Sequence, residues 1–242
     1  MLVLEKRVSE TPLEALERLR RERPELAAET LSYAGRLDPM AEGAMIVLVG
    51  EEENRPESRA KFLSLDKEYV ATFLVGAKTD TGDCLGLVDL NADAQPFSFK
   101  VESDRILEEV RRLQKITKQA YPWFSGKTVG GVELFDHFKA GNTGIERPEQ
   151  DIAIKEADVL GFEERSMKEV KKYIIESIRN VRGDFRQREI LTRWEDVMSD
   201  DGTVCLFRVR FLVSSGTFIR SLTEHFSVPV TLLSLNRTRI LM

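Results

Sequence analysis

The sequence predicts a mixed α/β fold, because runs typical of β-strands occur between amphipathic segments typical of α-helices. Strand patterns, either continuously apolar or alternating, occupy residues 44–49, 69–75, 151–162 and 204–213. Helical spacing of apolar residues occurs in residues 11–24, 56–65, 103–117 and 166–181. The 242 residues are enough to bury a substantial core.

Three of the predicted helices carry recognisable start signals. Thr11 with Glu14, and Ser166 with Glu169, have the spacing of capping boxes, in which each side chain bonds the other residue's backbone. Ser103 precedes the third amphipathic segment and is expected to be its N-cap.

Composition excludes several classes of protein. No apolar run approaches the roughly 20 residues that span a bilayer, and the first residues lack the pattern of a secretory signal. Cys84 and Cys205 form no CxxC motif, and the histidines His137 and His225 stand alone, so no metal site is expected. We therefore expect a cytoplasmic protein with reduced thiols and no contact with membranes.

The charge distribution is more informative than the net charge of −5. Residues 111–127 contain five basic and no acidic side chains, interleaved with aromatic residues. Residues 202–223 contain three arginines and no acidic side chain. A protein that is acidic overall can still present one basic face to the phosphates of a nucleic acid.

An aspartate in the segment 32–50 is the first candidate for chemistry. Asp38 directly precedes Pro39, which restricts its backbone to extended conformations, and the apolar strand pattern 44–49 follows. One interpretation is an ordinary Asp-Pro turn that enters a strand. The other is an active-site carboxylate fixed at the mouth of a core strand.

Two further candidates lie next to predicted strands, and each has a purely structural alternative. Tyr69 follows Lys67 at the start of a strand, where it could equally be a core aromatic. The turn 79–86, T-D-T-G-D-C-L-G, has the wrong ligand spacing for an EF-hand calcium loop. Arg220 is expected in the first turn of a helix, where the dipole disfavours a cation, so it either pairs with a carboxylate or phosphate or is a solvated surface arginine.

Taken together and in order, these segments resemble the TruB family of pseudouridine synthases. The loop G-R-L-D-P-M-A-E-G around Asp38 is similar to the family's catalytic loop, and K-E-Y at Tyr69 followed by the turn 79–86 is similar to a second motif. Residues 121–141, which predict a glycine hairpin followed by a helix, resemble the mobile thumb that closes on RNA. The segment S-S-G-T-F-I-R around Arg220 resembles a third motif.

This resemblance implies the pseudouridine synthase fold, an α/β (mixed α+β) architecture with a long, mainly antiparallel central sheet flanked by helices. It implies a single catalytic domain over residues 1–242 with the thumb at about 121–141, and we expect no C-terminal PUA domain. The implied reaction is isomerisation of uridine to pseudouridine in RNA, above all at the T-loop uridine of tRNA (position 55), without a cofactor. The expected partner is the tRNA T-arm, bound by a monomer.

The resemblance also assigns roles to individual residues. Asp38 would act at the ribose, either as nucleophile on C1′ or as base toward the C2′ proton, and both options stay open. Tyr69 would stack on the base and help remove the C5 proton, and Arg220 would pair with Asp38 and keep it ionised and oriented. The residues implied to bind RNA are Tyr33, Arg36, Lys67, Lys127, Thr217, Leu235 and Arg237.

Departures from the family pattern keep other functions open. Tyr33 stands where bacterial tRNA enzymes usually carry a histidine that wedges into the T-loop, so Tyr33 either replaces it by stacking or signals a different RNA. The family's opening D-K-P-x-G-x-T-S segment is matched only weakly around Lys6. The alternatives are an inactive RNA-binding chaperone on the same fold and a synthase for another RNA, including a guide-RNA-dependent one. Binding alone has no need of Asp38, Tyr69 and Arg220 together.

Overall fold

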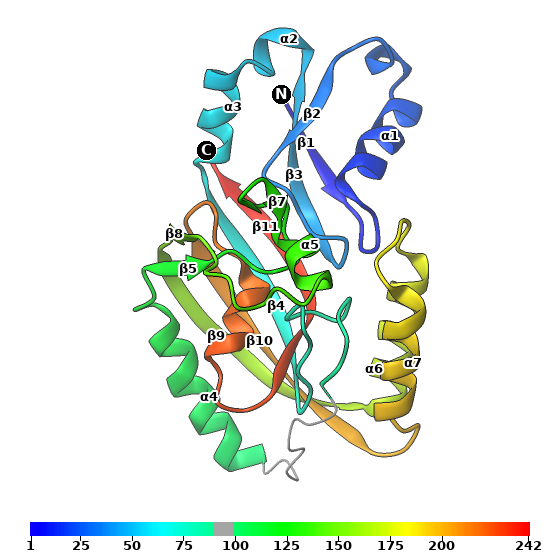
Figure 1. Ribbon diagram of the computed structural model, residues 1–242, viewed down its shortest axis with the longest axis vertical. Helices are drawn as coiled ribbons and strands as arrows, with labels where there is room; N and C mark the ends of the chain where they lie inside the picture. Colours follow the sequence, from blue (N-terminus) through cyan, green and yellow to red (C-terminus); the bar gives the residue numbers. More distant parts are fainter. Residues whose placement is uncertain (90–98) are drawn as a thin grey trace.

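The computed structural model describes residues 1–89 and 99–242 and centres on one large sheet (Figure 1). Within the described residues its strands run in the order β1-β3-β11-β4-β10-β9, and β2 also pairs with β3. Every pairing is antiparallel except that of β11 with β3. The strands are β1 (Leu2–Lys6), β2 (Leu31–Ala34), β3 (Ala41–Val49), β4 (Asp66–Val75), β9 (Ile154–Ser166), β10 (Thr203–Val213) and β11 (Val230–Leu241).

Helices and two small ribbons surround this sheet. The helices are α1 (Pro12–Glu22), η1 (Pro24–Leu26), α2 (Gly50–Glu53), α3 (Pro56–Leu63), α4 (Phe99–Leu113), α5 (Leu134–Lys139), α6 (Met167–Asn180), α7 (Gln187–Val197) and η2 (Ile219–His225). The ribbons pair β5 (Lys118–Ala120) with β8 (Glu149–Asp151), and β6 (Thr128–Val129) with β7 (Val132–Glu133). None of the helices within 1–89 and 99–242 is long and apolar enough to cross a bilayer.

The alternation of side chains along the strands builds two apolar layers. Phe73 and Val75 of β4 face the main core together with the buried face of α4. Leu74, which points the other way, lies in a second core with α6 and with the fully buried Trp194 of α7. The helix α4 therefore covers one face of the sheet, and α6 and α7 cover the other (Figure 1).

The predicted mixed α/β architecture with a mainly antiparallel sheet is confirmed, and most element boundaries agree with the sequence patterns. The capping box of α1 is present, since Thr11 Oγ1 accepts from the Glu14 backbone and Glu14 accepts from the Thr11 backbone. The pattern 151–162 proves to be two strands, β8 and β9. The helix α7 was not predicted from the sequence.

One predicted helix cap and one predicted capping box are wrong. The helix α4 begins at Phe99, so Ser103 lies inside it and cannot be its N-cap. Ser166 is the residue before α6, as predicted, but its side chain makes no capping bond. Ser166 is also the last residue of β9 and pairs with Thr203 of β10.

Candidate active site

Asp38 and Arg220 meet in the structure although 182 positions separate them in sequence. The guanidinium Nε of Arg220 donates to Asp38 Oδ2 at 2.8 Å, and its two other nitrogens donate to the backbone oxygens of Thr81 at 2.9 Å and Phe124 at 2.7 Å. The Arg220 side chain is only 6% exposed, whereas that of Asp38 is 36% exposed. The buried arginine thus fixes a carboxylate that solvent or substrate can reach.

Both elements that present this pair depend on glycines at close backbone approaches. Gly43 follows the Asp38 loop with φ +106°, and a Cβ there would lie 2.4 Å from the backbone oxygen of Arg237 in β11. Gly82 has φ +78°, and its Cβ would lie 2.4 Å from the backbone oxygen of Arg220. The glycines of the two motifs therefore let the Asp38 loop and the turn 79–86 approach their neighbours.

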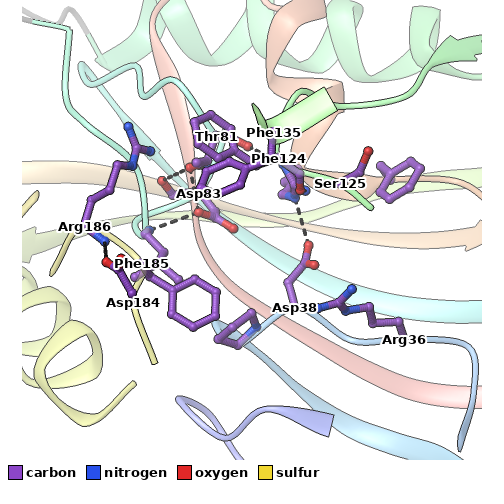
Figure 2. Close-up of a pocket in the computed structure, with 14 residues that line it drawn as sticks. Arg36, Asp38, Thr81, Asp83, Phe124, Ser125, Phe135, Asp184, Phe185 and Arg186 are labelled. Carbon is purple, nitrogen blue, oxygen red and sulfur yellow. Dashed lines mark hydrogen bonds and ion pairs between the residues drawn. The ribbon is translucent and has the colours of Figure 1, made fainter. Parts of the chain in front are cut away.

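A cavity of about 200 Å³ opens beside the ion pair (Figure 2). Its polar wall contains the carboxylates of Asp38 and Asp83 and the guanidinium of Arg220. Its aromatic wall is formed by Phe124, Phe135, Phe185 and Phe218. A charged group able to act on a sugar and flat apolar surfaces able to hold a base therefore face the same space.

Asp83 is a second buried carboxyl group in this site, and the sequence motif had suggested only a turn there. Its Oδ1 accepts from Thr81 Oγ1 at 2.8 Å and from the Leu85 backbone nitrogen at 3.0 Å. Burial raises the pKa of Asp83 to about 6, and the nearby charge of Arg220 opposes that rise. The second acidic residue of T-D-T-G-D, which is Asp83, was the sequence signal that could have identified this carboxyl group as part of the site.

Replacing Asp83 with asparagine is expected to flatten the pH dependence of the free energy of unfolding. A raised carboxyl pKa in the folded state stabilises the protein below the unfolded pKa near 4, and this contribution is lost as pH rises through about 6. The shift of about two units corresponds to about 3 kcal/mol. Urea unfolding of wild type and Asp83→Asn at pH 4 and pH 7 measures the difference.

The surface variant Asp158→Asn serves as the control for this comparison, because it removes a carboxylate that is 53% exposed and does not line the cavity. Equal pH dependence in wild type and Asp83→Asn would show that Asp83 titrates normally in the folded protein.

Buried cations hold the Asp38 loop from behind. Lys6 of β1 is fully buried, and its Nζ donates to the backbone oxygens of Pro39, at 3.3 Å, and Ala41. Arg237 of β11 donates to the backbone oxygen of Gly35 at 3.0 Å. Burial lowers the pKa of the Lys6 amine to about 8. The weak match around Lys6 thus marks a residue that positions the loop.

Two residues that the resemblance implied to bind RNA occupy the interior instead. Arg237 is 1% exposed and Lys67 is 5% exposed. The Lys67 amine donates to the Leu63 backbone oxygen at 2.9 Å, and burial, followed by the charge of Arg237, lowers its pKa to about 8. Both side chains donate hydrogen bonds to backbone carbonyls near the site. In this conformation they stabilise the site and do not face solvent.

The remaining residues implied to bind RNA lie at different depths. Arg36 is exposed at the cavity rim and forms no hydrogen bond or ion pair with any described residue. Lys127 is exposed and lies 4.8 Å from the ring centre of Tyr121. The others are half-buried: Tyr33 on β2 against the α1 core, Thr217 bonded to the Ser214 backbone, and Leu235 beside Asp38 in a smaller cavity.

Tyr69 lies beneath the site and not in its cavity. It is 7% exposed and belongs to the main core, together with Leu37 and Ile219, the sequence neighbours of Asp38 and Arg220. Its hydroxyl makes no hydrogen bond to any residue in the described part of the chain. Asp38 and Arg220 therefore line the cavity, whereas Tyr69 packs in the core next to their sequence neighbours, and the catalytic role of Tyr69 stays a prediction.

The thumb-like segment 121–141 forms the predicted hairpin and helix and contributes to the cavity itself. Phe124 and Phe135 line the cavity, and their ring centres lie 5.4 Å apart. The Phe124 backbone oxygen accepts from Arg220, so this segment is tied to the same side chain that holds Asp38. Figure 2 shows Phe124 and Phe135 above Asp38.

Comparison with known proteins finds similar sequences and a similar fold. The family described as "TruB family pseudouridylate synthase (N terminal domain)" matches residues 23–176. The tRNA pseudouridine synthase B of Psychrobacter cryohalolentis is 30% identical over 60% of this chain and 38% of its own length. That of Bordetella avium is 31% identical over 67% of this chain and 63% of its own length.

The chain thus spans less than two thirds of either curated relative. A chain in the crystal structure of a Cbf5–Nop10–Gar1 complex has the same fold, with a TM-score of 0.53 and 16% identity over 98% of this chain and 48% of that one. The family match covers nearly two thirds of the sequence and includes Asp38, Tyr69, Asp83 and the thumb. This chain therefore belongs to the TruB family of pseudouridylate synthases.

Proposed function

We propose that this chain isomerises uridine to pseudouridine in RNA, with the T-loop uridine of tRNA as its substrate. The observation that carries the proposal is the Asp38 carboxylate, held by the buried guanidinium of Arg220 at the wall of an aromatic cavity. Membership of the family supports the reaction, and the curated relatives are named for their action on tRNA.

The chemistry needs no net oxidation and no added group. The N1–C1′ bond of uridine breaks, uracil turns within the cavity, and a C5–C1′ bond forms. The C5 proton leaves, and N1 gains a proton, so the product is an isomer of the substrate. Asp38 acts at the ribose, as nucleophile on C1′ or as base toward C2′–H, and Arg220 orients it for either step.

Access to the cavity requires the uridine to leave the base stack of the loop. Unstacking costs a few kcal/mol, which stacking on cavity rings such as Phe124 and Phe135 offsets. Arg36 at the rim, which pairs with none of the residues in 1–89 and 99–242, is placed to contact a phosphate of the flipped nucleotide. The half-exposed Asp38 carboxylate would then face the ribose of that nucleotide.

Neutralising three exposed lysines should weaken RNA binding and reduce its salt dependence. Lys115, Lys118 and Lys127 lie between the end of α4 and the thumb hairpin and are exposed. Their replacement by glutamine removes up to three phosphate contacts, so the slope of log K against log salt should fall by about 2 to 3. Binding titrations at several salt concentrations measure this change. Unchanged affinity and slope would place the RNA groove elsewhere.

Mapping pseudouridine across total RNA from cells with and without this gene tests the proposed function. We expect one T-loop uridine of tRNA to lose its modification when the gene is absent and to regain it when the gene is restored. A complete map that is identical in both strains would contradict the proposal. Loss of a site in another RNA would keep the reaction and change the substrate.

A further inference from the structure

One wall of the cavity comes from a part of the chain that lies outside the family match, which ends at residue 176. The turn between α6 and α7 contributes Asp184, Phe185 and Arg186 to the cavity lining (Figure 2). The two helices are anchored to the sheet by the second core, so this turn is presented on a rigid support. The wall is therefore a feature of this chain that the family motifs do not describe.

Arg186 makes the most specific contacts of this turn. The two terminal nitrogens of its guanidinium donate to the two carboxylate oxygens of Asp80, at 2.9 Å to Oδ2 and 3.3 Å to Oδ1. The same guanidinium lies 4.5 Å from the ring centre of Phe124 in the thumb. The side chains of Arg186 and Asp80 are each 19% exposed, so the pair is largely shielded from solvent.

The backbone of Arg186 is unusual for a residue with a side chain. Its φ of 62° and ψ of 25° lie in the left-handed region, which glycine or asparagine adopts more readily. Arg186 adopts this disfavoured backbone conformation, and its guanidinium contacts both Asp80 in the turn 79–86 and Phe124 in the thumb. This conformation also points to a useful variant, because glycine fits the backbone and removes only the side chain.

We infer that Arg186 is a positioning residue for the proposed synthase reaction, and this inference rests on that proposed function. Arg186 is anchored by Asp80 and clamps the Phe124 ring at the cavity. The Phe124 backbone oxygen in turn accepts from Arg220, which holds Asp38. Arg186 thereby fixes both the aromatic wall and the carbonyl that orients the Arg220–Asp38 pair.

Loss of this clamp should slow the chemical step more than it weakens RNA binding. The Phe124 wall would no longer be held against the flipped base, and small displacements of reacting groups cost about 10- to 100-fold in rate. We expect Arg186→Gln and Arg186→Gly to lower kcat by about this factor with KM little changed. Arg186→Lys should recover part of kcat, because it keeps a cation beside Asp80 and Phe124.

Arg188→Gln is the matched control. Arg188 lies two residues away at the start of the same helix, is exposed, and does not line the cavity. We expect wild-type kinetics for this variant. Arg186→Gly relieves the left-handed strain, so a fall in its kcat cannot be assigned to backbone strain.

A second readout follows the thumb without any reaction. The chain has two tryptophans, of which Trp194 is fully buried and Trp123 precedes Phe124 in the thumb. Trp123 contacts Phe138 at 6.0 Å between ring centres, and Phe138 contacts Phe124 at 4.8 Å. Acrylamide quenching therefore reports on Trp123, and we expect it to increase in Arg186→Gly and Arg186→Gln but not in Arg188→Gln.

The outcomes separate this inference from the function on which it rests. If wild type isomerises uridine and Arg186→Gly keeps both wild-type kcat and wild-type quenching, Arg186 does not position the site. A rise in KM alone, with unchanged kcat, would also overturn the inference. If wild type is inactive on every RNA, the proposed function fails, whereas the quenching comparison still shows whether Arg186 holds the thumb.

Discussion

Asp38→Asn is expected to abolish isomerisation while leaving folding and RNA affinity nearly unchanged. Asparagine keeps the shape of the side chain and can still accept from Arg220 Nε, but it is neither a nucleophile nor a base. Because the Asp38 side chain is 36% exposed, the change buries no new polar group. Loss of nucleophilic or general-base action should lower the rate by about 10⁴-fold. Tritium release from RNA labelled at uridine C5 measures the rate, and a binding titration measures the affinity.

Asp158→Asn is the control for the change in net charge, because Asp158 is an exposed residue of β9 that pairs with Arg210. It should release tritium at the wild-type rate. If Asp38→Asn also did so, Asp38 could not be the residue that acts at the ribose.

Arg220→Lys should cause the second-largest loss, through both catalysis and stability. A lysine amine can reach one of the three oxygens that the guanidinium now binds, so two of Asp38, Thr81 and Phe124 lose their partner. Each buried acceptor left unpaired costs about 1–3 kcal/mol in the free energy of unfolding. Misplacement of Asp38 adds a rate loss of about 100-fold.

These two effects can be separated in one set of measurements. Thermal unfolding gives the range of temperatures over which Arg220→Lys is folded, and single-turnover rates are then measured within that range. Arg210→Lys is the control, because Arg210 is 37% exposed and pairs with the exposed carboxylates of Glu156 and Asp158. A folded Arg220→Lys protein with wild-type kcat would show that the fork geometry of the guanidinium is not required.

The sequence predicted the Asp38 loop and most of the secondary structure, because these depend on residues that are close together in sequence. Asp38 is fixed by the proline that follows it, and the strand behind the loop is visible as an apolar run. The first helix is read from its proline and capping box. The ion pair between Asp38 and Arg220 could be expected only from the family resemblance, since no local pattern joins residues so far apart.

Features that depend on long-range packing could not be predicted. Arg237 and Lys67 look like surface cations in sequence, but the pairing of β11 with β3 and β4 places them in the interior. The raised pKa of Asp83 results from its burial, which the turn sequence does not reveal. Arg186 lines the cavity because the turn between α6 and α7 lies beside it, and the sequence did not predict α7.

Conversion of an unmodified tRNA transcript by the purified chain tests the central claim most directly. Wild type and Asp38→Asn are each incubated with the transcript, and the position of any pseudouridine is mapped base by base. We predict that wild type converts a single T-loop uridine to completion and that Asp38→Asn converts none, although both bind the RNA. A wild-type protein that is folded and binds the transcript but forms no pseudouridine would contradict the account, and so would equal conversion by Asp38→Asn.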